Sequence, residues 1–252
     1  MNPIAFKSAV AAVLCAGSLS AMAATNWSLT NSAANEPSVT GWKASNNTTN
    51  INGTDVGYWV GSGIGVGGEP SNDNQHALDN KAGYEVALLS FDSLVRLESV
   101  KAGWAPNDSD IFVMAFTGFG SMTAAQSLDG GTFASLASRG WTLVGNYGNI
   151  GTATKELGTT SGAFENTYSS FWLIGAGGFT AGTGVNSGDV RNNGVVRDFS
   201  NQTYDYLKLA SVGGTVKPND GGGSVPEPGS LALAGIALLG MVGLRRSRRI
   251  PV

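Results

Sequence analysis

The chain has 252 residues, of which 42% are hydrophobic and only 13% are charged, and its formal net charge at pH 7 is −3. This acidic balance argues against a nucleic-acid binder, because such proteins gather Lys and Arg to neutralise phosphate groups. The chain contains one cysteine and one histidine. These numbers exclude a disulfide framework and a metal centre built from several cysteines or histidines.

The N-terminal 23 residues have the composition of a secretory signal peptide. Lys7 supplies a positive start, and residues 9–19 supply an apolar stretch. The small-x-small sequence Ala21-Met22-Ala23 is a pattern that a signal peptidase cuts, so the mature chain is predicted to begin at Ala24. Signal peptidase and the secretion machinery are therefore expected partners.

Cys15 lies inside the apolar stretch of the predicted signal peptide. Leu14, directly before it, is too bulky for lipoprotein cleavage, so Cys15 is expected to leave with residues 1–23. The mature protein then has no thiol for a disulfide or for a nucleophile. Residues 24–224 carry 10 Lys and Arg against 17 Asp and Glu, a net charge of −7, and no nucleic-acid partner is expected.

Residues 24–211 are predicted to form one all-β domain, an antiparallel β-sandwich of jelly-roll type. Glycine is abundant, with 37 residues in the chain, and short apolar or alternating runs are separated by Gly, Asn, Asp and Ser clusters. The predicted strands cover residues 56–60, 84–91, 95–104, 111–116, 141–147, 170–176 and 203–212. One helix is predicted at residues 132–139, where Phe133, Leu136 and Ala137 share a face.

Four details of this sheet are predicted from the pattern. The apolar phase of residues 95–104 changes near Ser99, which indicates a β-bulge. Residues 105–110 have turn chemistry, which predicts a hairpin between residues 95–104 and 111–116. Residues 111–116 are apolar on both faces, which predicts a central, covered strand. The alternation that starts at Tyr204 predicts a half-exposed strand.

His76, the sole histidine, lies beside Asp73, Asn74, Asp79 and Asn80. Oxygen atoms that converge there could bind calcium, and the imidazole with two acidic partners could bind a transition metal. A polar loop before a strand accounts for the same residues. A Ser-His-Asp triad would also need His76, yet no Gly-x-Ser-x-Gly elbow precedes a helix.

Three other patterns contain residues that could carry chemistry. Asp108 and Asp110 are weak candidates for calcium ligands, and a solvated acidic turn is the competing interpretation because EF-hand and repeat-toxin spacings are missing. Glu85 and Glu98 have no spacing specific to a glycosidase pair. The glycine-rich residues 61–68 lack the following Lys and Ser or Thr of a phosphate loop. We therefore expect a protein that is not an enzyme and needs no cofactor.

Tryptophan is frequent for a domain of this size: Trp27, Trp42, Trp59, Trp104, Trp141 and Trp172. Three of them lie inside apolar strands and are expected in the core, namely Trp104, Trp141 and Trp172. Trp42 and Trp59 lie near Asn- and Gly-rich segments and are the candidate glycan contacts, because exposed indole rings stack on the apolar faces of sugars.

The C-terminal end combines several pieces in a fixed order. Residues 212–224 are rich in glycine and predict a flexible linker. An extended motif follows, in which two prolines disfavour helix: Val225, Pro226, Glu227, Pro228, Gly229 and Ser230. Residues 230–244 are apolar and predict a short transmembrane helix, which four arginines end: Arg245, Arg246, Arg248 and Arg249. A permanent membrane anchor is the competing interpretation, although residues 231–244 would span only about 20 Å as a helix, against ~30 Å of hydrocarbon.

Residues 225–249 resemble the PEP-CTERM sorting signal of Gram-negative bacteria. The resemblance implies recognition and cleavage by an exosortase, a membrane protease or transpeptidase, near Pro226-Glu227-Pro228. It also implies that the chain is anchored for a time in the inner membrane and is then delivered to the cell surface or the extracellular space.

The body of the chain is similar to a family of exosortase-dependent surface proteins, in segments such as residues 83–91, 100–104, 172–176 and 206–211. The family implies a destination and leaves the activity open. We expect a structural or adhesive protein of the cell surface or the biofilm matrix. The alternative is a carbohydrate-binding module that engages extracellular polysaccharide through Trp42 and Trp59, with or without calcium.

Overall fold

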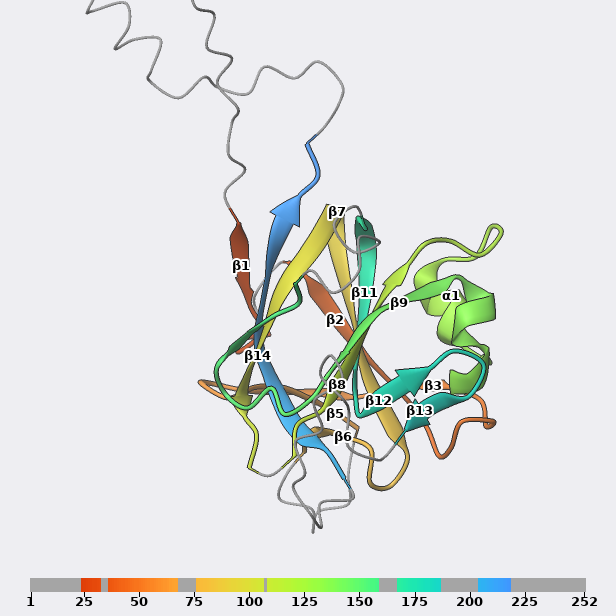
Figure 1. The fold of residues 1–252 in the computed structure, drawn as a ribbon, viewed down its shortest axis with the longest axis horizontal. Coiled ribbons are helices and arrows are strands. Elements are labelled where there is room, and N and C mark those ends of the chain that lie inside the picture. The colour runs from red at the N-terminus through yellow and green to blue at the C-terminus, as the bar shows by residue number, and fades with distance from the viewer. Residues whose placement is uncertain are drawn as a thin grey trace, which may run out of the picture. The chain divides into compact units, whose positions relative to one another are not determined.

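The computed structural model describes residues 24–32, 36–67, 76–106, 108–158, 167–186 and 204–218 (Figure 1). The predicted signal peptide, Asp73, Asn74 and the predicted sorting motif lie outside the described residues. Within them the domain is mostly antiparallel β-sheet, which confirms the all-β prediction. The jelly-roll order of the strands stays a prediction.

Fourteen strands and two short helices make up the described part of the chain. The strands are β1 (Thr25–Ser28), β2 (Ser38–Ala44), β3 (Asn52–Thr54), β4 (Val56–Trp59), β5 (Gly63–Val66), β6 (Leu78–Asp79), β7 (Tyr84–Trp104), β8 (Ile111–Phe116), β9 (Trp141–Tyr147), β10 (Thr154–Glu156), β11 (Ser169–Ala176), β12 (Gly178–Thr180), β13 (Gly184–Asn186) and β14 (Tyr206–Val216). The helices are α1 (Ala124–Leu128) and the 3₁₀ helix η1 (Phe133–Arg139).

The 21-residue strand β7 organises the sheet. Its first part pairs with β2 and β11, and its second part pairs with β14 and β10. The main hydrogen-bonded path runs β4-β5-β14-β7-β11-β8-β9. The sequence predicted two strands here, over residues 84–91 and 95–104, with Asp92, Ser93 and Leu94 between them. These three residues are instead an exposed part of one continuous strand.

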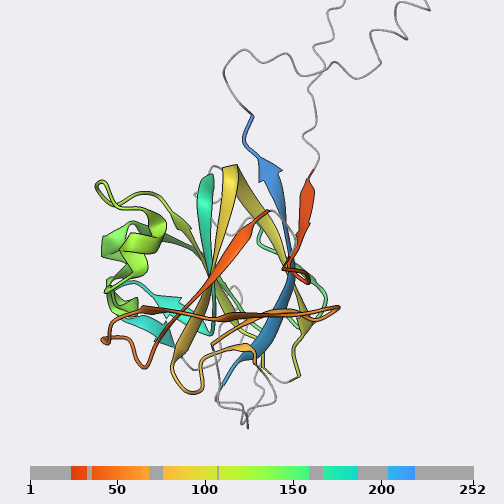
Figure 2. The ribbon, with the colours of Figure 1, turned by 180° about the vertical axis from the view of Figure 1, so that it is seen from behind.

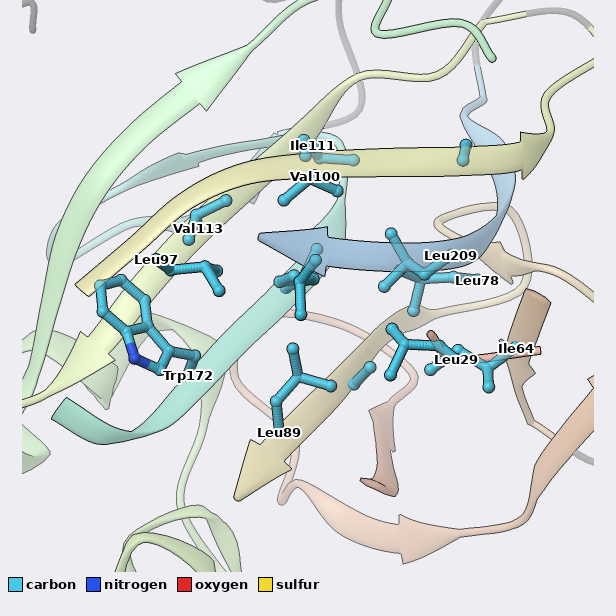
Figure 3. Packing of buried hydrophobic residues seen from close by; sticks show 14 of the residues in the cluster. Leu29, Ile64, Leu78, Leu89, Leu97, Val100, Ile111, Val113, Trp172 and Leu209 are labelled. Atoms are coloured by element: carbon cyan, nitrogen blue, oxygen red, sulfur yellow. The ribbon is translucent and has the colours of Figure 1, made fainter. Parts of the chain in front are cut away.

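Strand β7 therefore belongs to two arms of the sheet. The first arm contains β2, β3, β8, β9 and β11, and the second contains β1, β4, β5, β6, β10 and β14. Seen from behind, the orange-red β2 lies in front of the yellow β7, and the red β1 lies beside the blue β14 (Figure 2). The larger hydrophobic cluster takes residues from both arms. Leu89, Trp172 and Leu209, from β7, β11 and β14, point into the same interior (Figure 3).

Strand β8 contributes to two hydrophobic clusters because its side chains alternate between two faces. Ile111 and Val113 belong to the larger cluster, whereas Phe112 and Met114 belong to a second one with residues of α1 and η1. The helices lie together beside β9 (Figure 1). The prediction of a central strand covered on both faces is confirmed.

The predicted bulge in β7 is confirmed. Ser99 pairs with Gly213 and Leu97 pairs with Gly214, so Glu98 is an extra residue on β7 at this point. The predicted helix is also found, as the 3₁₀ helix η1 that begins after Thr132. Helix α1 was not predicted, although Thr123 and Gln126 form a capping box at its start.

The predicted hairpin across residues 105–110 is wrong. Strand β8 pairs with β9 and β11 and has no register with β7. Strand β11 pairs with both β7 and β8 and lies between them. The polar residues of the loop are used for contacts with the start of β14 instead of closing a tight turn, since Asp108 forms a bridge with Asp205.

Two predictions about β14 are wrong. The strand is buried on both faces over Tyr206–Ala210, not half-exposed, because Leu207 and Leu209 join the larger hydrophobic cluster and Lys208 packs against Trp59 and Trp104. It also continues through residues 212–216, which the sequence assigned to the linker. These residues pair with β7, and Val212, Gly213 and Gly214 pair with β1 as well. The compact unit that contains the strands extends to Lys217.

The tryptophans predicted for the core differ in burial. Trp141 and Trp172 are 2% and 0% exposed, which confirms the prediction for both. The indole N–H of Trp141 donates to Ser127 Oγ at 2.8 Å, and that of Trp172 donates to the Ser169 carbonyl at 3.0 Å. Trp104 is only partly buried at the end of β7. Buried indoles thus keep a hydrogen-bond partner, as their polarity requires.

Candidate functional site

Three buried aspartates converge in the described domain. Asp108 and Asp110 lie between β7 and β8, and Asp205 precedes β14. They are 4%, 2% and 2% exposed, and one carboxylate oxygen of each lies within 4.8 Å of the others. We call these residues the aspartate cluster. The bridge between Asp108 and Asp205 means that the backbone itself joins the two segments.

Hydrogen bonds fix the carboxylates of the aspartate cluster. Asp205 Oδ1 accepts from the Asp110 N–H at 2.8 Å, and Asp205 Oδ2 accepts from the Asn80 side-chain amide at 2.7 Å. Asn80 Oδ1 in turn accepts from the Asp205 N–H at 2.9 Å. Asp110 Oδ1 accepts from the Asn149 N–H at 2.7 Å. The cluster thus holds four chain segments in one arrangement.

Burial is the main cause that raises the pKa of Asp205 to about 8, and the charges of Asp110 and Asp108 raise it further. The hydrogen bonds from the Asp110 N–H and from Asn80 lower the pKa of Asp205, but by less. Like charges at this separation repel strongly in a buried site. The repulsion is relieved when Asp205 holds a proton, or when a cation takes the place of that proton.

The aspartate cluster offers oxygen ligands of the kind that Ca²⁺ prefers. It is the one group of three or more His, Cys, Asp or Glu side chains with converging ligand atoms that the described residues contain. The sequence indicated Asp108 and Asp110 as weak metal candidates. The competing interpretation, a solvated acidic turn, is wrong because both residues are buried. Asp205 was not among the predicted candidates. Its position between Tyr204 and Tyr206, as an acidic residue inside a predicted strand, could have drawn attention to it.

His76 is used for packing. Its imidazole stacks on the Trp59 ring with 5.7 Å between the ring centroids and 20° between the planes. Its neighbours Asp79 and Asn80 have other partners: Asp79 Oδ1 accepts from the Lys81 N–H, and Asn80 binds Asp205. Asp73 and Asn74 lie outside the described residues. Among the described residues, His76 belongs to no group of three or more side chains that could hold a metal ion.

Glu85 and Glu98 lie in different parts of β7. They are separated by thirteen residues of one strand, or roughly 40 Å of extended chain. Glu85 Oε2 accepts from the Asp79 N–H at 3.2 Å, whereas Glu98 forms an ion pair with Arg96 and accepts from Thr215 Oγ1 at 3.0 Å. The two carboxylates therefore do not form the pair that a glycosidase needs.

Trp59 contributes to an aromatic arrangement around a buried lysine. The Lys208 ammonium lies 4.3 Å from the centroid of the Trp59 ring and 4.8 Å from that of the Trp104 ring. Lys208 is 8% exposed, and burial lowers its pKa. Cation–π attraction is stronger where the cation is desolvated. Since His76 also stacks on Trp59, the ring of this glycan candidate is already in contact with protein groups.

Trp42, the other glycan candidate, lies on β2, the strand that supplies Lys43 and Ala44 to the lining of a pocket of about 400 Å³. The pocket is lined by residues of β2, β3 and the loop between them, and by Ala82. Its polar lining consists of Lys43, Ser45, Thr49, Asn50 and Asn52. Trp42 pairs with Gly53, which also lines the pocket, and its indole N–H donates to Thr40 Oγ1 at 3.0 Å. The pocket and Trp42 thus belong to the same hairpin.

Comparison with known protein families identifies a sorting motif in the chain. A family model described as the PEP-CTERM protein-sorting motif matches residues 224–249. The chain carries a PEP-CTERM sorting signal. No curated protein matches the chain. No solved structure matches it either.

The PEP-CTERM motif implies processing by an exosortase and export toward the cell surface or the extracellular space. The matched range includes the predicted motif residues and the arginine cluster. Strand β14, the last one in the described residues, ends at Val216, and seven residues separate it from the matched range. Of the helices in the described residues, none is long and apolar enough to cross a membrane. The apolar residues 230–244 lie outside that part.

Proposed function

We propose that the protein is a non-catalytic structural or adhesive component of the cell surface or the extracellular polysaccharide matrix of a Gram-negative bacterium. In this proposal, signal peptidase removes residues 1–23, and residues 230–244 hold the chain in the inner membrane for a time. An exosortase then cuts near Pro226-Glu227-Pro228 and frees the acidic domain. The observation that carries the proposal is the PEP-CTERM motif at residues 224–249.

A non-catalytic role is supported by the surroundings of the candidate catalytic groups. His76 stacks on Trp59, and Glu98 is paired with Arg96. Each side chain thus has a packing or pairing function that accounts for its presence. The aspartate cluster is buried within the domain, and its contacts join chain segments to one another.

Replacement of Glu227 by Ala should leave the C-terminal tail uncut, because Glu227 supplies the one fixed charge of the Pro-Glu-Pro sequence. Intact mass spectrometry on culture medium and membranes of the native host measures the outcome. The wild-type protein should begin at Ala24 and end within residues 226–228, and the variant should keep its tail. Glu156→Ala, an exposed acidic position on β10, is the matched control. A wild-type chain that keeps its tail through Val252 and is found only in membranes would mean that the tail is a permanent anchor.

A second candidate function is carbohydrate binding through the β2–β3 hairpin. The observation that favours it is the pocket of about 400 Å³ on this hairpin, since ligand pockets of this size are common in binding proteins. Its hydroxyl and amide lining suits the hydroxyl groups of a sugar. Trp42 on the same hairpin is the aromatic side chain proposed to stack on the sugar, and it is not part of the pocket lining.

Trp42→Ala should weaken the binding of extracellular polysaccharide by about tenfold, the equivalent of ~1.4 kcal/mol. The reason is the loss of the stacking face, and Trp42→Phe should restore part of the binding. Trp59→Ala is the comparison variant: it should lower the melting temperature, because it removes a contact of Lys208. Retention of the mature protein on immobilised polysaccharide measures binding. Equal retention of wild type and Trp42→Ala would remove Trp42 from the proposed site.

A further inference from the structure

The pocket on the β2–β3 hairpin has a charge opposite to that of the domain. Of its eight lining residues, only Lys43 is charged, and none is acidic. Residues 24–224 as a whole carry a net charge of −7. The pocket therefore presents one positive charge on an acidic protein.

The Lys43 ammonium has no ion-pair partner among the described residues. Within the described residues, Lys43 takes part in no ion pair and no side-chain hydrogen bond: the ion pair found there joins Arg96 and Glu98. Glu85, opposite Lys43 in the register of β2 and β7, accepts from the Asp79 N–H instead. A lysine that lines a pocket without a counter-ion can pair with an anionic group of a ligand.

The polar lining around Lys43 is already ordered by internal hydrogen bonds. Asn46 Oδ1 accepts from the N–H groups of Thr48 and Thr49 at 2.9 and 3.0 Å, which fixes the loop. The hydroxyl groups of Ser45 and Thr49 lie 3.1 Å apart, and the Asn52 side-chain amide donates to the Asn50 carbonyl at 2.9 Å. A pocket ordered in this way loses little conformational freedom when a ligand binds.

We propose that this pocket binds an anionic sugar residue of an acidic polysaccharide, with Lys43 as the counter-ion of its carboxylate or sulfate group. The proposal rests on the carbohydrate-binding function above and names the class of ligand. The Asn50 and Asn52 side chains and the hydroxyl groups of Ser45 and Thr49 then face the sugar hydroxyls. A neutral sugar would leave the ammonium without a partner. A single pocket binds weakly, and a polymer with repeated anionic residues raises the apparent affinity through rebinding.

Affinity electrophoresis of the secreted protein tests the proposal, in native gels that contain polygalacturonate, dextran sulfate or neutral dextran. Wild type should be retarded by polygalacturonate or by dextran sulfate, and the polymer that retards it identifies the anion as carboxylate or sulfate. Lys43→Gln should lower the association constant at least fivefold, and Lys43→Arg should restore it. Lys101→Gln removes the same charge at an exposed position of β7 and should bind like wild type.

Several results would overturn the proposal. An equal loss in Lys43→Gln and Lys101→Gln would mean that the polymer responds to net charge alone. Binding of neutral dextran that depends on Trp42 but not on Lys43 would leave the carbohydrate-binding function standing without the anionic ligand. Retardation by none of the polymers would contradict both the carbohydrate-binding function and the anionic ligand. A thermal melt of each variant shows whether weaker binding comes from unfolding. Binding by Lys43→Arg, which keeps the positive charge, shows whether that charge is what the polymer needs.

Discussion

In a metal-free buffer the protein should lose stability as the pH rises from about 4 to about 8. An unfolded aspartate ionises near pH 4, whereas burial, together with the charges of Asp110 and Asp108, raises the pKa of folded Asp205 to about 8. Between these values the unfolded chain has released a proton that the folded chain still holds, so a higher pH favours unfolding. For one proton the slope reaches about 1.4 kcal/mol per pH unit, and it ends above pH 8.

Asp205→Asn should remove this contribution to the slope, because an amide does not ionise. The slope is the decisive quantity, since the new amide also faces the Asn80 side-chain amide, which now donates to Asp205 Oδ2. The absolute stability of the variant can therefore fall at every pH while its pH dependence becomes flatter. Urea unfolding in EDTA, at each pH unit from about 4 to about 9, gives the free energy of unfolding for both proteins.

Asp92→Asn is the matched control, because Asp92 lies on an exposed part of β7, and it should keep the slope of the wild type. Parallel slopes in wild type and Asp205→Asn would contradict the argument. Calcium added at pH 8 distinguishes a proton from a cation as the group that relieves the repulsion. Stabilisation of the wild type by calcium, absent in Asp205→Asn, would show that the aspartate cluster binds the ion.

Two of the three residues of the aspartate cluster could be predicted from the sequence. Asp108 and Asp110 are two residues apart, and their spacing alone draws attention to a shared site. Asp205 is nearly a hundred residues away, and only the pairing of β14 with its neighbours brings it to the loop before β8. Burial could not be predicted either, because polar loop residues are usually solvated. Both the position of Asp205 and the burial of the cluster depend on pairing between strands that are far apart in the sequence.

The limits of the fold prediction have the same origin. Local patterns located β8 and β9 at their observed bounds and the bulge beside Ser99. The hairpin from β7 to β8 was wrong because a turn-like sequence does not determine which strands pair. Strand β11, more than fifty residues further along, lies between them. Strand β2 was missed, since Gly41 and Lys43 weaken its apolar alternation, yet it pairs with β7 over seven residues.

Gly214→Ala should destabilise the domain by about 2 kcal/mol, within the 1–3 kcal/mol typical of overpacking. The sequence assigned Gly213 and Gly214 to a flexible linker, in which an added methyl group would be harmless. In the structure Gly214 pairs with Leu97 of β7 and Thr25 of β1. A Cβ at Gly214 would meet the backbone carbonyl of Arg96 far inside van der Waals contact. Backbone cannot rotate away as a flexible side chain can, so the two strands must separate.

Gly158→Ala is the matched control for this close approach of strands. A Cβ at Gly158 has open space around it, and no left-handed backbone conformation is required there, so its urea midpoint should stay near that of the wild type. The midpoint of Gly214→Ala should fall with an unchanged denaturant slope, as expected when stability changes and the exposed surface does not. Equal midpoints for the two variants would place residues 212–216 in a linker. A lower midpoint for Gly214→Ala alone makes these glycines part of the sheet, because their lack of a side chain lets β14 lie between β1 and β7.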